Sequence, residues 1–194
     1  MADWNYIGEI RLLQMQLYAM TGAGAYDLDA LIEADKLRLT PDGFYGLSGQ
    51  TWIVDRHHRH HPDSRYWHAS EVLSFGFTSH YDHMWDLFRT TPLGIAGENV
   101  IVDTPSMLTI DDIAGGVKIE TSSGTAEFRT PEVAEPCVEF TRFLTDRPDA
   151  DARELKPWRE QLRHGVRGYV VAVDDHEPFE VSTGDRVSVK AGRC

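Results

Sequence analysis

The chain has 194 residues, of which 41% are hydrophobic and 26% charged, proportions typical of a globular protein with a substantial core. The formal net charge of −12 argues against a nucleic-acid or anionic-membrane partner, because such partners need a basic face. The two cysteines, Cys137 and Cys194, provide no disulfide framework. With neither a signal peptide nor an apolar run of about 18 residues, we expect a cytoplasmic protein with one domain over residues 1–194.

The first half of the chain is predicted to combine short strands with helices. Residues 7–17 favour a strand, and Asp27 can cap a helix over residues 28–37. The turn sequence Pro41-Asp42-Gly43 and the glycines at 46 and 49 favour a loop, which is followed by a strand at residues 51–54. Helices are expected at residues 70–75 and 80–88, and the second has Tyr81, Met84, Trp85 and Phe88 on its core face.

Beyond residue 100, short β-rich stretches alternate with Gly, Asp, Ser or Pro turns. Pro157 can begin a helix that runs through His164. Many short strands with few helices predict an α+β fold that is mainly β, in the form of a largely antiparallel β-barrel. The expected strands occupy residues 100–102, 117–121, 125–130, 168–173, 179–181 and 186–189.

Cys137 is the only interior cysteine, and the preceding proline stiffens the backbone that carries it. A thiolate is both a nucleophile and a soft metal ligand, so Cys137 is a candidate for sulfur transfer or metal binding. A free cysteine also packs as a small, inert hydrophobe, and the nearby Glu132, Glu135 and Glu139 favour a neutral thiol. The residue types alone are compatible with both interpretations.

Two further segments contain residues that suit an anionic ligand. In Gly97-Glu98-Asn99, the glycine lets backbone N–H groups approach an anion, and Asn99 both donates and accepts hydrogen bonds. The same residues also suit a tight turn before a strand. Arg167 has a bidentate fork that suits phosphate, although Arg-Gly is also a common entry to a strand.

The histidine-rich segment 55–68 is the most unusual part of the chain. Its histidines at 57, 58, 60, 61 and 68, with Asp55 and Asp63, can supply two or three metal ligands. Their spacing matches no HExxH or CxxC pattern. A solvated surface loop is the alternative interpretation. His80 and His83, three residues apart on a predicted helix, are interpreted as surface or capping residues.

Four short motifs resemble those of the MOSC family, which is named for the C-terminal domain of molybdenum-cofactor sulfurase. They are Gly97-Glu98-Asn99, Pro136-Cys137, Arg167-Gly168 and Gly184-Asp185. The resemblance covers about residues 46–190, and its specificity comes from the order and approximate spacing of the motifs. Asp55-Arg56-His57 and the later Arg65 also match a family pattern, with Val54 in place of a glycine.

The resemblance implies a barrel fold and a site for a molybdenum–pterin cofactor. It implies that Cys137 is catalytic, either as a ligand of molybdenum or as a carrier of sulfur. Glu98 and Asn99 would bind the cofactor or shape its site, and the other candidates for cofactor binding are Arg56, His57, Arg65 and Arg167. The expected reaction is reduction of an N-hydroxylated or N-oxidised small-molecule substrate. A separate flavin or iron–sulfur reductase would supply electrons, since the chain has neither a dinucleotide fingerprint nor a cysteine set for a cluster.

Two other functions fit the same residues. In one, Cys137 receives a sulfane sulfur as a persulfide and transfers it without any metal. In the other, the barrel has no cofactor and binds or transforms another small molecule through the 55–68 loop. The acidic residues around Cys137 and the missing glycine at Val54 favour this last function. Metal and persulfide analysis of the purified protein would distinguish the three.

Overall fold

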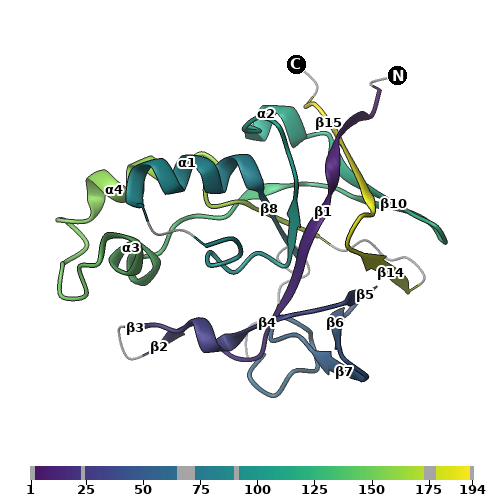
Figure 1. Cartoon of the computed structure of the whole chain (residues 1–194), viewed down its shortest axis with the longest axis horizontal. Coiled ribbons are helices and arrows are strands. Elements are labelled where there is room, and N and C mark those ends of the chain that lie inside the picture. Colours follow the sequence, from purple (N-terminus) through teal and green to yellow (C-terminus); the bar gives the residue numbers. More distant parts are fainter. Residues whose placement is uncertain (1–2, 23–24, 65–72, 90–91, 173–177, 193–194) are drawn as a thin grey trace.

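The structure, a computed structural model, describes residues 3–22, 25–64, 73–89, 92–172 and 178–192. Figure 1 shows curled strands on one side of the molecule and the helices α1, α3 and α4 gathered on the other. The strands are β1 (Asn5–Gln16), β2 (Thr21–Gly22), β3 (Ala25–Tyr26), β4 (Leu31–Glu33), β5 (Lys36–Thr40), β6 (Gly43–Ser48), β7 (Thr51–Val54), β8 (Leu73–Phe77), β9 (Val100–Val102), β10 (Gly116–Thr121), β11 (Gly124–Phe128), β12 (Glu132–Val133), β13 (Tyr169–Val171), β14 (Phe179–Ser182) and β15 (Arg186–Lys190). The helices are α1 (Thr78–Phe88), α2 (Ile110–Ile113), α3 (Val138–Thr145) and α4 (Lys156–Gln161), with a 3-10 turn, η1, at Leu28–Ala30.

The larger sheet has the strand order β11-β10-β15-β1-β9-β8-β13-β12, and β4 pairs with the end of β1. Among these described strands, β8 and β9 form the one parallel pair. The 12-residue strand β1 pairs in turn with β15, β9 and β4. Its register shifts at Tyr6/Gly8 and at Ile10/Leu12. Because such irregularities bend a strand and increase its twist, the sheet curls into a half-barrel.

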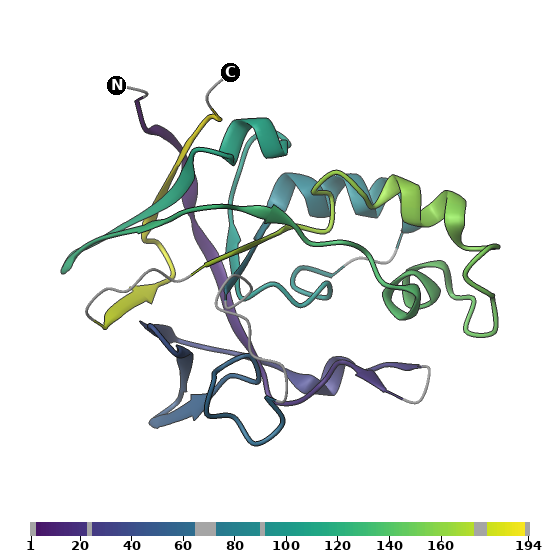
Figure 2. The same ribbon diagram turned by 180° about the vertical axis from the view of Figure 1, so that it is seen from behind.

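Two smaller β-structures complete the arrangement. A four-stranded antiparallel sheet has the order β14-β5-β6-β7. The strands β2 and β3 form a separate ribbon, and β3 contacts α3. Figure 2 shows, from behind, the ribbon on the same side of the molecule as α3 and the four-stranded sheet on the opposite side. The ribbon therefore brings a segment from early in the chain to a helix from its second half.

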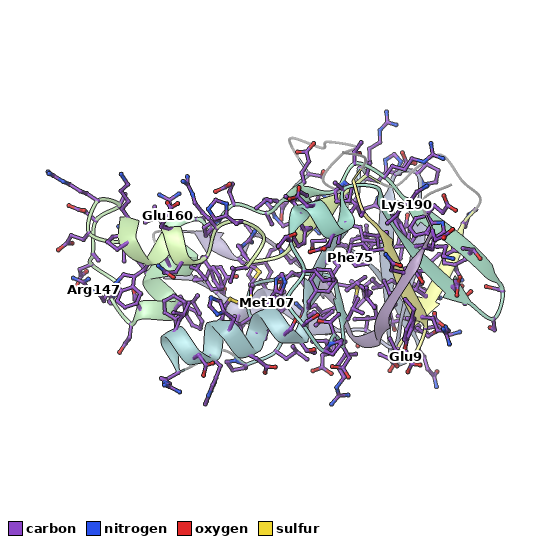
Figure 3. All side chains as sticks on the ribbon, turned by 90° about the horizontal axis from the view of Figure 1, so that it is seen from above. Glu9, Phe75, Met107, Arg147, Glu160 and Lys190 are labelled. Atoms are coloured by element: carbon purple, nitrogen blue, oxygen red, sulfur yellow. The ribbon has the colours of Figure 1, made fainter. Side chains whose placement is uncertain are left out.

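Apolar side chains form two cores because successive residues of a strand point to opposite faces. Phe75 and Phe77 of β8 belong to the core inside the curled sheets, and Figure 3 shows Phe75 in the interior, between the strand-rich and the helical sides. Ile101 of β9 faces the other way and packs with Phe140 of α3 and Met84 of α1. Within the described ranges, no helix is long and apolar enough to cross a membrane.

The predicted fold class is confirmed: the protein is mainly β, with a barrel-like, largely antiparallel sheet and a few helices. The predicted opening strand is β1, the strand predicted at residues 51–54 is β7, and the predicted helix at 80–88 is the greater part of α1. The helix expected from Pro157 is α4, where proline occupies one of the first two positions. The six strands predicted beyond residue 100 correspond to β9, β10, β11, β13, β14 and β15.

Three local predictions are wrong because strand pairing overrides local spacing. The helix predicted at 28–37 is one 3-10 turn, which Asp27 caps by accepting from the Asp29 amide at 2.9 Å, followed by β4 and β5. The predicted glycine loop is β6, which is paired on both sides; a Cβ at Gly46 would lie 2.0 Å from Met15 Sδ. Residues 73–75, predicted to be helical, belong to β8, whereas residues 70–72 lie outside the described residues.

The face of α1 also differs from its prediction. Tyr81 and Met84 are buried as expected, but Trp85 is 50% exposed. His80, predicted to lie at the surface or in a cap, is 1% exposed. Both ring nitrogens of the buried imidazole have partners, which offsets the cost of removing them from water. Nδ1 lies 2.9 Å from the Gly165 carbonyl oxygen, and Nε2 accepts a hydrogen bond from the Leu108 amide at 3.1 Å.

Candidate functional site

A cavity of about 140 Å³ lies where the end of β1, β8, the segment before β9 and the turn before β13 meet. Four of the residues selected from the sequence, namely His57, Glu98, Asn99 and Arg167, line it together. These residues come from three segments that are distant in the sequence, so the fold has brought them to one place. The complete lining consists of Gln16, His57, Ser74, Ala96, Gly97, Glu98, Asn99, Ala134, Arg167 and Val170.

Glu98 is a buried carboxyl group in the wall of this cavity, with 3% of its surface exposed. Its Oε2 accepts a hydrogen bond from the Tyr81 hydroxyl at 2.5 Å. Glycine is needed beside it, because a Cβ at Gly76 would lie 2.8 Å from Oε1 and one at Gly168 would lie 3.1 Å from the same atom. Burial raises the pKa of Glu98 to about 6, although the Tyr81 hydrogen bond and the charge of Arg167 act in the opposite direction.

Arg167 supplies a positive charge to the same cavity. Its Nη2 donates to the Ala96 carbonyl at 3.2 Å, and its guanidinium carbon lies 5.8 Å from the centre of the Phe140 ring. Its Nε is buried and has no hydrogen-bond partner within the described part of the chain. A buried guanidinium N–H without a partner is costly, whereas the positive charge that Arg167 brings to the cavity suits an anionic ligand.

Tyr26, from the β2–β3 ribbon, packs against Phe140 and Phe143 of α3, the helix that Cys137 precedes. Its hydroxyl donates to the Ile95 carbonyl at 2.8 Å. Burial raises the pKa of this hydroxyl, Arg167 lowers it through its charge and a hydrogen bond, and Glu98 and Cys137 raise it further. The Tyr26 hydroxyl therefore lies close enough to Arg167, Glu98 and Cys137 to be influenced by all three.

Cys137 is the N-cap residue of α3, with an extended backbone. Its Sγ accepts a hydrogen bond from the Phe140 amide at 3.3 Å, and its carbonyl oxygen accepts one from Thr141 Oγ1 at 2.8 Å. It is partly buried against the apolar core under the helices, and it is not among the residues that line the cavity. The sulfur thus occupies the helix N-terminus, a position that favours negative charge.

Asp55 and His57 form a second polar unit at the cavity. Asp55 is fully buried; its Oδ1 accepts from the His57 amide at 2.8 Å and lies 2.9 Å from His57 Nδ1. Its Oδ2 accepts from the Gln16 amide at 2.7 Å. Because the carboxylate engages Nδ1, the imidazole is held with Nε2 available for another partner.

The anion cradle predicted for Gly97-Glu98-Asn99 is wrong in one respect, because the backbone amides of Gly97 and Asn99 already donate to carbonyl groups of the protein. The amide of Gly97 donates to the Gly94 carbonyl at 2.9 Å, and that of Asn99 donates to the Ser74 carbonyl at 3.1 Å. The Asn99 side chain is also engaged, since Oδ1 accepts from Ser74 Oγ at 2.8 Å and Nδ2 donates to the Gln14 carbonyl at 3.4 Å. This segment shapes the cavity wall, and the charged side chains are left to contact a ligand.

The remaining candidates lie apart from the cavity or beyond the described residues. Arg56 does not line the cavity; its amide donates to the Gln16 carbonyl at 2.8 Å, and its buried Nε has no partner among the described residues. Arg65 falls outside the described residues. Within the described ranges, no three His, Cys, Asp or Glu side chains are grouped closely enough to hold a metal ion.

Sequence reasoning missed the two tyrosines of the site. Tyr81 was assigned only to the core face of a helix, because period-3.6 spacing indicates burial but not the partner of a hydroxyl. Tyr26 follows Gly22-Ala23-Gly24, and this turn composition between short polar stretches was the available signal for a hairpin. Asp55, a candidate metal ligand of the histidine-rich segment, instead engages the His57 imidazole.

Comparisons with known proteins support the fold. No protein-family model matches the chain, and no curated protein matches its sequence. Among solved structures it is similar to the YuaD protein from Bacillus subtilis, with a TM-score of 0.59, 18% sequence identity, and coverage of 98% of this chain and 100% of that chain. It is also similar to YiiM from Escherichia coli, with a TM-score of 0.54, 15% identity, and coverage of 96% of this chain and 71% of that chain. Both are stand-alone MOSC-type proteins, so the fold fits the family that the motifs resemble.

Proposed function

We propose that this chain is a stand-alone MOSC-type protein that holds a molybdenum–pterin cofactor and reduces an N-hydroxylated or N-oxidised small molecule. The observation that carries the proposal is the convergence of Arg167 and Cys137 on Phe140 of α3. The Arg167 guanidinium carbon lies 5.8 Å from the centre of the Phe140 ring, and the Phe140 amide donates to Cys137 Sγ at 3.3 Å. A cation and a soft sulfur ligand therefore both contact one residue. The two ends of a metal–pterin phosphate need these two kinds of group.

The residues fit such a cofactor at both of its ends. At the anionic end, Arg167 supplies a guanidinium group to the cavity lining. At the metal end, the Cys137 sulfur is at a helix N-terminus and accepts a hydrogen bond from the Phe140 amide at 3.3 Å. The cavity of about 140 Å³ is close to the roughly 150 Å³ that accommodates a benzene-sized molecule. It therefore suits the phosphate rather than the whole cofactor.

Each residue then has a distinct role. Arg167 binds the anionic end through a charge-assisted hydrogen bond, and Asp55 orients His57 so that Nε2 is directed to a ligand or substrate. Tyr26 packs against Phe140 and Phe143 and donates to the Ile95 carbonyl, which holds the β2–β3 ribbon against α3. When bound, the cofactor supplies a metal that exchanges oxygen and electrons with the substrate. A separate flavin or iron–sulfur reductase provides the electrons.

Sulfur transfer is a second candidate, and one observation favours it. The Phe140 amide donates to Cys137 Sγ, and a donor at a helix N-terminus stabilises an anionic persulfide as well as a thiolate. In this function Cys137 accepts the outer sulfur atom of a persulfide donor and passes it to an acceptor. The cavity beside Arg167 would then bind an anionic group of the donor or the acceptor.

Metal and persulfide analysis of protein made in a host that synthesises the cofactor tests both candidates. We expect wild-type protein to contain molybdenum, and Cys137→Ser to lose most of it while remaining folded, since serine is nearly isosteric but a much weaker soft-metal ligand. Cys194→Ser is the matched control and should retain the metal. Arg167→Gln should also deplete the cofactor, because it removes the charge at the anionic end.

The other outcomes are equally informative. A persulfide on Cys137 in molybdenum-free protein would replace the reductase proposal with sulfur transfer. Full activity of Cys137→Ser, against whichever substrate the wild type converts, would overturn both thiol mechanisms and would favour the cofactor-free barrel that binds or transforms another small molecule.

A further inference from the structure

The cavity contains opposite charges that its proposed role as an anion site does not explain. Arg167 and Glu98 both line it, and the charge of Arg167 acts on Glu98. An anion that binds to Arg167 must therefore enter a small, buried space that already contains a carboxylate. Two like charges at close range in a poorly hydrated site repel strongly.

Glu98 cannot relieve this repulsion by moving away. Tyr81 holds one of its oxygens at 2.5 Å, and the other fits into a slot bordered by Gly76 and Gly168, where even a methyl group would come within about 3 Å of it. The Tyr81 hydroxyl also accepts from the Ala96 amide at 3.2 Å, which fixes its orientation. The carboxyl group is thus rigidly placed in the wall, and only its charge can change.

We propose that the cavity binds an oxyanion together with one proton, the anion at Arg167 and the proton on Glu98. This inference rests on the proposed function, because the same cavity would accept the phosphate end of the cofactor. The inference adds one condition for binding, which is that Glu98 must be protonated. A protonated carboxyl no longer repels the anion, and it gains an O–H donor. The ligand class is a tetrahedral or planar oxyanion, such as sulfate, phosphate or a carboxylate.

The proton is available near neutral pH. Burial raises the pKa of Glu98 to about 6, so a modest bias from a bound anion is enough to protonate it. The other groups that face Glu98 do not replace it: burial raises the pKa of Tyr81 and of Tyr26, which keeps both hydroxyls protonated. Cys137 influences Tyr26 from the side of α3, and His57, paired with Asp55, is the titratable group on another wall of the cavity.

Sulfate is the probe of choice because it does not titrate between about pH 5 and 8, so any pH dependence belongs to the protein. Calorimetric titration of the cofactor-free full chain with sulfate, in buffers of different ionisation enthalpy, gives the affinity and the number of protons taken up. We expect uptake of close to one proton at pH 7 and an affinity that weakens about tenfold per pH unit above about pH 6. A ¹³C titration of the Glu98 carboxyl should show its midpoint rising when sulfate is present.

Three variants assign the proton. Glu98→Gln keeps the size and an acceptor for Tyr81, and it should bind sulfate with little dependence on pH. Glu127→Gln makes the same change on β11, away from the cavity lining, and it should behave like wild type. His57→Gln should retain the proton uptake that is assigned to Glu98.

The results separate this inference from the proposed function. Two results would overturn the inference and leave the anion site intact. One is sulfate binding without proton uptake. The other is proton uptake that persists in Glu98→Gln and vanishes in His57→Gln. Absence of sulfate binding at every pH, or binding that is unaffected by Arg167→Gln, would overturn the anion site and with it the proposed placement of the cofactor.

Discussion

The rings of Tyr26 and Phe140 pack against each other with their centroids 5.2 Å apart, and this contact joins the β2–β3 ribbon to α3. Tyr26 also packs against Phe143 at 5.3 Å. Through these contacts a two-residue strand is held next to Cys137, the residue that begins the helix. The placement of the tyrosine hydroxyl in the site therefore depends on aromatic packing as well as on hydrogen bonding.

Tyr26→Phe should destabilise the protein by about 1–2 kcal/mol, because it leaves the Ile95 carbonyl without its donor while retaining the ring contacts. Denaturant unfolding measures the change. Tyr18→Phe is the matched control: its hydroxyl bonds to Asp27 at an exposed position, and it should cost less than about 0.5 kcal/mol. Equal effects in the two variants would show that the Tyr26 hydroxyl has no special structural role.

Glu98→Gln should stabilise the protein at pH 7. Burial raises the pKa of Glu98 in the folded state, so its contribution to stability is complete below about 4.5 and is lost as the pH rises through about 6. The difference between 4.5 and about 6 corresponds to about 2 kcal/mol. Denaturant midpoints measured from acid to neutral pH should show this loss in wild type and in Glu127→Gln, but not in Glu98→Gln. A variant less stable than wild type at pH 7 would contradict the assignment.

His80 should contribute a loss of stability in acid. Burial lowers its pKa below the ordinary value of 6.5, and Leu108 donates to Nε2, so the folded state needs the neutral imidazole. As the pH falls, His80 is protonated at a higher pH in the unfolded chain than in the folded protein. The stability of the folded protein therefore decreases as the pH drops below about 6.5. His80→Gln should reduce that fall, whereas His164→Gln, at an exposed position, should not. The same acid dependence in all three proteins would exclude His80 as its source.

Gly76→Ala should disturb the cavity. The added methyl group would lie 2.8 Å from Glu98 Oε1 and 2.9 Å from its Cδ, and the Tyr81 hydrogen bond prevents an easy displacement of the carboxyl. A cost of about 1–3 kcal/mol is expected, together with weaker binding of sulfate. Gly22→Ala, where a Cβ meets nothing within 4 Å, should be tolerated. Comparable unfolding midpoints for the two alanine variants would mean that the slot at Gly76 relaxes freely.

The candidate site could be predicted from the sequence only as a set of residues. Sequence motifs indicate Arg167, Glu98, Asn99 and His57, and the structure places all four at one cavity. Cys137, the N-cap residue of α3, is not among the lining residues of that cavity. The sequence did not indicate that the Asn99 side chain is hydrogen-bonded to Ser74 and Gln14. Hydrogen-bond partners that are many residues apart are set by strand pairing, which a motif does not describe.

The fold class and most of the strands follow from the sequence alone, because period-2 alternation and turn residues act locally, over a few positions. The sequence also specifies which chemical groups are available, including a single interior thiol. Which of these groups are buried, and therefore which are charged, depends on the tertiary structure. The pKa of Glu98, the neutral state of His80 and the arrival of Tyr26 at the site all depend on contacts between distant segments. Desolvation and packing arise only when those segments meet, and no local spacing specifies them.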